Sequence, residues 1–365
     1  MASRFQIRLG EGAEPAADAF YTPVTTLEVE ENADLPGAIQ LTLPIAAADD
    51  DLTVVGDDRL APYSRIAVVV SVDGKPDACI FDGYVLSHQV HLDKGITGST
   101  VRVWGQDVSC LMNLDERCHE WFTSDGAIAN AILGGDPYHF ATAPENTDDD
   151  SGDHPASGHS VMQRATDAQF LRERARRAGK LFRVCCTDRP GFNTGYFITP
   201  KLDGEPAARL VLNPATSANV DALDLSWDVA RPSQVKAQAL LRVRDAVDGG
   251  VGASGLRALD RRGLADLAGA HAMKVMLTTS VDDAGELRSR ARSVLREAGW
   301  FVTCAGEANL ARLDDGVLRV ASLVQVNGAG KIHSGTYFVW SVRHTITLDA
   351  HVMRFVLVRN ALGAP

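Results

Sequence analysis

The chain has 365 residues, of which 45% are hydrophobic, 23% charged and 6% aromatic, and this composition excludes a mainly disordered protein. Its 47 acidic residues outnumber the 36 lysines and arginines, and the net charge of −11 argues against nucleic acid or an anionic membrane as a partner. The length predicts two or three domains, and the longest apolar run, Ile66 to Val70, is too short to span a bilayer. With no apolar run of signal-peptide length at its N-terminus, we expect a protein made in the cytoplasm without a membrane anchor of its own.

The first part of the chain, residues 1–115, reads as strands separated by turns. The segments that alternate or are rich in β-branched residues are 25–30, 38–43, 65–72, 79–86 and 99–104. Short strands without intervening helices favour an antiparallel sandwich or barrel over a parallel α/β sheet. We therefore expect a first β-barrel domain at 1–115.

Residues 116–214 change to a mixed pattern. Ser124 precedes an apolar run at 127–133 that ends at Gly134, which is typical of a short capped helix. Thr166 and Asp167 open a second helix with an apolar stripe that includes Phe170 and Leu171, and Gly179 ends it before a strand at 181–184. These features predict a small α+β domain.

The acidic loop, residues 142–160, interrupts this domain. It contains Asp148, Asp149, Asp150, Asp153, His154 and His159. Their spacing matches neither a calcium-binding loop nor a tetrahedral zinc site, and such a composition cannot bury a core. We expect a solvated, mobile insertion, with no metal and no cofactor.

The six cysteines are too sparse to predict a disulfide framework. They are Cys79, Cys110, Cys118, Cys185, Cys186 and Cys304. Most lie in apolar, strand-like segments, so we expect buried free thiols. The adjacent pairs 118–119 and 185–186 lack the partners that a metal site would need.

Residues 215–365 again favour strands. A strand is expected at 234–243 and a helix at 281–298, followed by strands at 306–313, 317–326, 336–344 and 351–358. A second antiparallel barrel is the simplest interpretation. The expected fold class is α+β, mainly β: two tube-like antiparallel β-barrels with a small α+β domain between them and helical insertions.

No stretch of the chain carries a recognisable catalytic motif. Nucleophile-elbow, zinc-helix, P-loop and dinucleotide patterns are absent from the sequence, and Gly328-Ala329-Gly330 predicts only a turn between strands. Glu116, Glu120 and Asp125 near Trp121 could contribute to a sugar cleft, but 47 acidic residues make such proximity common. His344 alternates out of an apolar strand, as surface or packing histidines do.

Three stretches taken together resemble the baseplate-hub family of contractile injection machines. They are the helix and strand at 163–184, the run from Gly328 through Gly335 to His344, and the closing strand 353–361. The family includes phage late control D proteins, the hub portion of type VI valine-glycine repeat protein G, and the hubs of extracellular injection particles. Segments 81–85 and 101–107 look like strands of the family's first barrel.

The resemblance assigns structural roles to the matching residues and no catalytic, cofactor or metal role to any of them. They are Thr166, Asp167, Phe170, Leu171, Gly179, Gly328, Gly330, Ser334, Gly335, Tyr337, His344, Phe355, Arg359 and Asn360. The sequence departs from the family pattern at Arg174, where the family has leucine, and at the acidic loop, which has no counterpart.

The resemblance implies a non-enzymatic homotrimer that joins a hexameric inner tube to a trimeric spike, in contact with baseplate wedge proteins. Only residues 360–365 follow the closing strand residues Phe355 to Arg359, so a separate spike polypeptide is expected. The protein would be assembled into a phage tail or a phage-like injection particle. Two alternatives remain open at this point: a tail-tip peptidoglycan hydrolase, and a carbohydrate- or receptor-binding tail protein.

Overall fold

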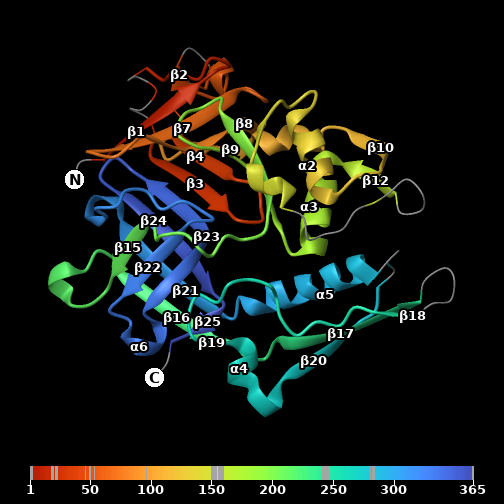
Figure 1. Cartoon of the computed structure of the whole chain (residues 1–365). Helices are drawn as coiled ribbons and strands as arrows, with labels where there is room; N and C mark the ends of the chain where they lie inside the picture. The colour runs from red at the N-terminus through yellow and green to blue at the C-terminus, as the bar shows by residue number, and fades with distance from the viewer. Residues whose placement is uncertain are drawn as a thin grey trace.

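A single large sheet organises the molecule (Figure 1). The computed structural model describes residues 3–17, 20, 24–45, 47–48, 51–52, 54–95, 97–148, 154, 160–240, 246–279, 281 and 284–363. Thirteen strands form this sheet, and most of its neighbouring strands are antiparallel. The expectation of a mainly β, α+β protein is confirmed.

The first half of the sheet comes from the N-terminal region. Its strands are β1 (Ser3–Leu9), β2 (Glu14–Pro15), β3 (Thr26–Asn32), β4 (Ala38–Pro44), β7 (Arg65–Val72), β8 (Ala78–His91) and β9 (Thr100–Asp107). The five predicted strands are all present, and β3 and β4 show the alternating burial that their sequences predict. Strand β1 was not predicted, although it pairs with β7 along its whole length.

The second half comes mainly from the C-terminal region. Its strands are β15 (Ala208–Val211), β16 (Ala222–Trp227), β21 (Val302–Asn309), β22 (Leu323–Asn327), β23 (Gly335–Ile346) and β24 (His351–Arg359). The prediction of a strand over 317–326 is wrong before residue 323, because a turn with Ala321 at φ 63° interrupts the extended chain. The predicted 306–313 strand is shifted: β21 ends at Asn309, where a short 3-10 helix begins.

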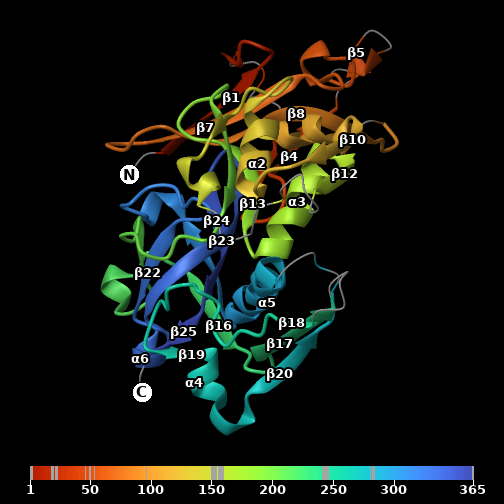
Figure 2. The ribbon, with the colours of Figure 1, turned by 45° about the vertical axis from the view of Figure 1, so that its right-hand side comes forward.

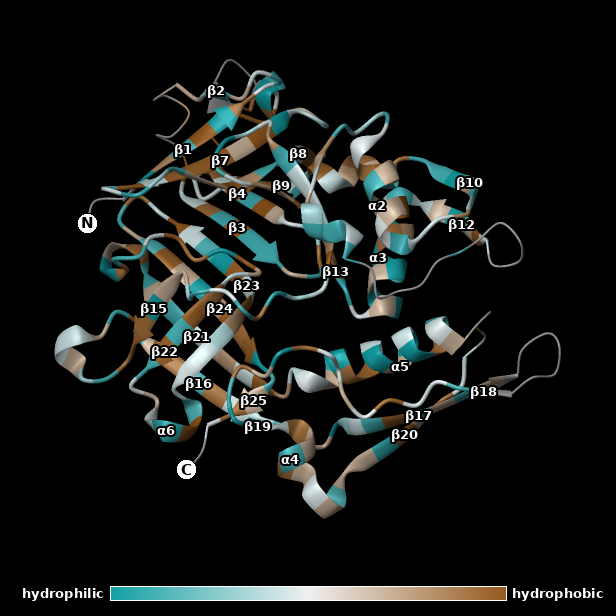
Figure 3. Ribbon diagram, viewed as in Figure 1, coloured by the Kyte–Doolittle hydropathy of each residue, from teal (hydrophilic) through white to brown (hydrophobic). Residues whose placement is uncertain are grey.

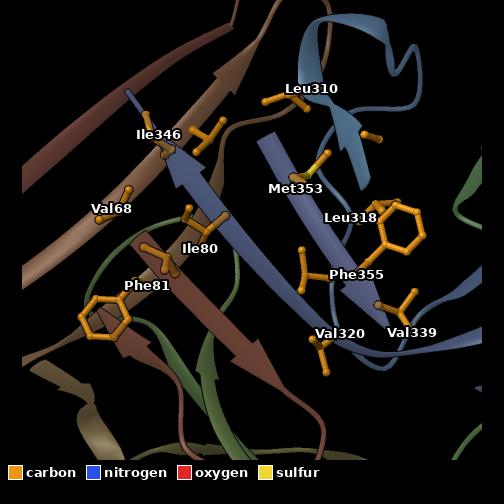
Figure 4. Packing of buried hydrophobic residues seen from close by; sticks show 14 of the residues in the cluster. Val68, Ile80, Phe81, Leu310, Leu318, Val320, Val339, Ile346, Met353 and Phe355 are labelled. Atoms are coloured by element: carbon orange, nitrogen blue, oxygen red, sulfur yellow. The ribbon is translucent and has the colours of Figure 1, made fainter. Parts of the chain in front are cut away.

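Strands β3 and β23 join the two halves. Their antiparallel register runs from Leu27 opposite Ile346 to Asn32 opposite Ser341. The pairings of the described strands leave this sheet open, and one hydrophobic core extends beneath both halves. Figure 4 shows Val68, Ile80 and Phe81 of the first half near the second half's core residues. The two β-regions are therefore packed as one body.

The middle region has its own core. Helices α2 (Asp125–Gly134) and α3 (Asp167–Ala178) pack with two small sheets, one of β10 (Glu116–Trp121) and β12 (Val161–Thr166). The other contains β11 (Ala141–Thr142), β13 (Leu181–Cys186) and β14 (Asn193–Ile198). Ser124 and Thr166 accept the capping bonds expected of them, and Gly179 ends α3 in the left-handed conformation.

An arm projects from the second half of the molecule (Figure 2). Strands β17 (Pro232–Leu240), β18 (Ala246–Asp248) and β20 (Met273–Leu277) form its sheet, and α5 (Ala284–Gly299) covers one face. Figure 3 shows hydrophobic stretches along the central strands and hydrophilic segments on α3 and α5. The predicted helix at 281–298 is present as α5, and residues 282 and 283 of the prediction lie outside the described residues.

Short elements complete the described chain. They are β5 (Ala47–Ala48), β6 (Asp51–Leu52), η1 (Asp58–Leu60), η2 (Val108–Asn113), η3 (Pro144–Thr147), η4 (Ala215–Ser217), β19 (Arg262–Gly263), α4 (Leu264–Ala268), η5 (Gly269–His271), η6 (Leu310–Arg312), α6 (Gly330–His333) and β25 (Ala361–Leu362). Within the described residues, no helix combines the length and apolar character needed to cross a bilayer.

Candidate functional site

The C-terminal motif residues converge around one buried arginine. We call this group the C-terminal cluster: Gly328, Ser334, Gly335, Tyr337, Arg359 and Asn360. Arg359 is fully buried at the end of β24, and its Nη1 donates to the carbonyl oxygens of His333 at 3.3 Å and Ser334 at 3.2 Å. Its guanidinium also pairs with Asp260 and lies 5.2 Å from the centre of the Tyr337 ring. A buried charge is thereby matched by an anion, carbonyls and an aromatic face.

Two glycines of the cluster lie where a side chain would not fit, one against Arg359 and one against the backbone of Asn213. A Cβ at Gly335, whose φ is +143°, would lie 3.0 Å from Nη1 of Arg359. A Cβ at Gly328, whose φ is +81°, would lie 2.5 Å from backbone atoms of Asn213. Side chains are excluded at both positions by backbone conformation and by space. Gly330 also has a positive φ, but open space surrounds it.

Polar side chains fasten the neighbouring loops to this cluster. The Tyr337 hydroxyl donates to the His333 carbonyl at 2.8 Å, and burial raises the pKa of Tyr337 to about 12. Asn360 accepts from the Leu259 amide at 2.9 Å and donates to the Arg257 carbonyl at 2.8 Å. The cluster thus ties the 257–260 segment to the end of the central sheet.

His344 and Phe355 lie in the core, away from that cluster. His344 is fully buried, and its Nδ1 lies 3.0 Å from Nε2 of His351. Burial lowers the pKa of His351 to about 4 and lowers the pKa of His344 as well. Both rings are therefore neutral at pH 7. Phe355 packs where Gly306 leaves space, since a Cβ there would meet its ring at 2.6 Å.

The motif residues of the middle region form a second group at the start of α3. Thr166 caps the helix, while Asp167 is 1% exposed and accepts from the Tyr138 hydroxyl at 2.8 Å and from Gln163 Nε2 at 2.6 Å. Nη1 of Arg117 lies 3.2 Å from the same carboxylate. Phe170 and Leu171 fill the adjoining core. This group fixes the register of α3 against β12.

Gly179 connects the middle region to the arm. Its φ is +65°, and a Cβ there would lie 2.9 Å from the Cα of Ser293 in α5. The side chain of Arg296 reaches across the same contact and donates to the Ala178 carbonyl at 3.0 Å. The glycine therefore permits close contact between the end of α3 and α5.

A third group was missed by the sequence analysis. Arg174, Asp125 and His154 are each no more than 6% exposed. Nη2 of Arg174 lies 2.7 Å from Oδ1 of Asp125 and 2.9 Å from Nε2 of His154. His154 belongs to the acidic loop, so the two departures from the family pattern meet in one buried network. The helical period places Arg174 on the apolar stripe of Phe170, Leu171 and Ala178. That position is the sequence signal that could have predicted its burial.

The acidic loop is anchored where the structure describes it, which corrects the expectation of a wholly solvated insertion. Asn146 is fully buried; it donates to Asn130 Oδ1 at 2.9 Å and accepts from the Phe197 amide at 2.7 Å. The ammonium group of Lys180 donates to the Asp148 carbonyl at 2.8 Å. Between Glu145 and Ser157 the sequence has no apolar residues except Pro155 and Ala156, and buried hydrogen bonds hold the described part of the loop instead. Asp149, Asp150, Asp153 and His159 lie outside the described residues.

Two of the carboxylates predicted near Trp121 have separate partners in the described part of the chain. Asp125 is engaged by Arg174, while Glu120 accepts from Ser160 on another edge of the middle region. No cluster of three or more His, Cys, Asp or Glu side chains in the described ranges could hold a metal ion.

Comparison with known proteins identifies the fold. No family model matches the sequence, and no curated protein matches it. A tail protein from Neisseria meningitidis MC58 aligns with 100% of this chain and 98% of its own length, at 14% identity and a TM-score of 0.65. The 43 kDa tail protein of prophage MuSo2 from Shewanella oneidensis aligns with 99% of this chain and 100% of its own, at 13% identity and a TM-score of 0.69.

A secretion-system protein has a related fold. The Escherichia coli c3393 protein, described as a type VI secretion component structurally similar to the T4 tail proteins gp27 and gp5, aligns with 100% of this chain and 79% of its own length. Its identity is 14% and its TM-score 0.52. The chain therefore has, over its whole length, the fold of phage tail proteins, which agrees with the resemblance to baseplate hubs.

Proposed function

We propose that the chain is a structural hub in the baseplate of a contractile tail or injection machine. The observation that carries this proposal is the match of the entire chain to two tail proteins that it covers almost end to end. The resemblance in the motif residues supports the same role, and ten of these fourteen residues gather into the C-terminal cluster and the group at the start of α3. The hub would be made in the cytoplasm and assembled into a phage tail or a phage-like particle.

The hub acts as a homotrimeric adaptor between a six-fold inner tube and a three-fold spike. Each chain contributes two strand-rich halves, so three chains present six similar positions around the axis. Among the described strands, β16 pairs only with β21 and β2 only with β1, which leaves sheet edges for neighbours to complete as tube-like barrels. An inner tube protein, a separate spike protein and baseplate wedge proteins are its partners.

Imaging of assembled particles tests this role. A reconstruction of the tail tip should contain three copies of the chain, about 117 kDa from three subunits of 39.1 kDa, between tube and spike. Six copies in one ring, or a single copy, would contradict the adaptor. So would a position for the chain outside the baseplate.

The proposed hub has no catalytic task. Of the three carboxylates near Trp121, Asp125 is buried and bound by Arg174, which argues against its use as the acid or base of glycoside hydrolysis. A zymogram on purified peptidoglycan should show no clearing by the purified chain. Clearing that disappears on mutation of Glu116 or Glu120 would establish the hydrolase alternative instead.

A further inference from the structure

Two cysteines that are distant in sequence lie together where the central sheet meets the middle region. Cys79 in β8 is 0% exposed and Cys186 at the end of β13 is 3% exposed. The Cys186 thiol donates to the Cys79 carbonyl oxygen at 2.8 Å, and the Cys79 amide donates to the Thr187 carbonyl at 3.1 Å. These bonds join Cys79 to both Cys186 and Thr187, so the two segments lie side by side. Segments paired in this way bring Cα atoms as close as a disulfide requires.

Both thiols lie in one small buried group, and each donates to a backbone carbonyl: Cys186 to that of Cys79 and Cys79 to that of Phe81 at 3.3 Å. Burial raises the pKa of Cys186. Val69 completes a small buried group with the two cysteines. Burial alternates along β13, so the adjacent Cys185 points to the opposite face and is not a member of this group.

We propose that Cys79 and Cys186 are an oxidisable pair whose disulfide locks the first β-region to the middle region. The oxidant is a small disulfide such as oxidised glutathione. One protein thiolate attacks it and releases one small thiol, and the second protein thiolate then attacks the mixed disulfide and releases the other. The two protein thiols thus lose two electrons and two protons, one S–S bond forms, and the oxidant is reduced to two thiols.

The redox state of the surrounding medium determines when this disulfide forms. In a reducing cytoplasm the pair stays as thiols, whereas an oxidising medium favours the disulfide. Since burial disfavours the thiolates, oxidation of the folded chain is slow and accelerates when the region opens. The pair is 107 residues apart, and closing so long a loop restricts the unfolded chain strongly. This inference does not depend on the proposed hub role.

The test uses the purified full-length chain. The chain is incubated with oxidised glutathione, with and without a sub-denaturing concentration of urea that gives the oxidant access to the buried cysteines. It is then denatured and alkylated. Mass spectrometry and non-reducing peptide mapping show which cysteines are linked. Two of the six thiols should resist alkylation, a peptide joining Cys79 to Cys186 should appear, and Tm should rise by on the order of 5 °C. Reductant should reverse all three changes.

Matched variants make the result specific. Cys304→Ser changes another buried cysteine and should leave the cross-link unaffected, whereas Cys79→Ser should abolish both the cross-link and the Tm shift. If all six thiols could still be alkylated after oxidation, both with and without urea, the proposal would be overturned. A cross-link through Cys185 or Cys110 would overturn it as well.

Discussion

Gly335 lies directly against the guanidinium of Arg359, because the glycine's missing side chain leaves the space that the buried cation occupies. Replacing Gly335 by alanine would both strain a backbone at φ +143° and displace Nη1 from the carbonyls that it contacts. We expect the Gly335→Ala variant to lose about 2 kcal/mol of unfolding free energy.

Urea denaturation of the Gly335→Ala variant measures this loss. Gly204→Ala is the matched control, because no atom lies within 4 Å of the added Cβ and the glycine has no positive φ there. Equal stability of the two variants would show that the C-terminal cluster tolerates a side chain at 335.

The buried network of Arg174 gives a second prediction. Replacing Arg174 by leucine, the residue of the family pattern, leaves the carboxylate of Asp125 buried without its cation. Breaking a buried pair from one side costs about 3 kcal/mol or more, so the variant should unfold at clearly lower urea concentration. The Asp125→Leu, Arg174→Leu double variant should recover part of the loss, since both charges are removed.

Arg176 supplies the control for that experiment. Arg176 lies two residues after Arg174 in α3 and pairs with Asp34 at 2.8 Å, but 58% of its side chain is exposed. An exposed pair contributes at most about 1 kcal/mol, so Arg176→Leu should have a small effect. Similar losses of unfolding free energy for the variants at 174 and 176 would show that the buried network of Arg174 does not hold the acidic loop.

The buried histidine pair predicts how stability responds to acid. In the unfolded chain a histidine pKa is 6.5, whereas in the fold burial lowers the pKa of His351 to about 4. Between pH 6.5 and pH 4 the unfolded chain binds a proton at His351 and the folded chain does not, so stability falls as pH falls through this range. The shift corresponds to roughly 3 kcal/mol, and His344 acts in the same direction.

Asp107 opposes this effect. Burial raises its pKa to about 6 from 3.8, so the folded chain binds a proton before the unfolded chain and gains stability as pH falls through the same range. Unfolding free energies of the wild type and of two variants, measured at pH 7 and pH 4.5, separate the effect of the histidines from that of Asp107. His351→Gln should gain stability relative to wild type on acidification, and Asp107→Asn should lose it; parallel profiles for all three proteins would refute both assignments.

Local signals in the sequence predicted the helix ends, and long-range contacts explain what they missed. Thr166 and Gly179 were recognisable because a capping hydroxyl and a left-handed glycine are properties of a few neighbouring residues. The pairing of β3 with β23 joins segments about 300 residues apart, and nothing in either strand specifies its partner. For that reason the sequence suggested two separate barrels where the described strands form one sheet.

The same reasoning applies to the candidate site. Gly335, Tyr337 and Arg359 were selected through the family resemblance, but their convergence on one guanidinium follows from the fold. Arg174 lay on an apolar stripe, yet its partner His154 lies in a polar loop whose composition predicts solvent exposure. A buried polar network is specified by geometry between distant residues, so composition alone cannot find it.

The contact between α3 and α5 leads to the last prediction. A side chain at Gly179 would meet the Cα of Ser293 at 2.9 Å and would also strain a residue at φ +65°, so α3 could not end so close to α5. Gly179→Ala should therefore lower the unfolding free energy by about 2 kcal/mol and increase hydrogen exchange at the end of α3 and along α5. Gly299→Ala, at the end of α5 with open space around the added Cβ, is the control and should leave exchange in α3 unchanged. If Gly179→Ala changed exchange only within α3, the arm and the middle region would be independent, and the glycine would serve the helix end alone.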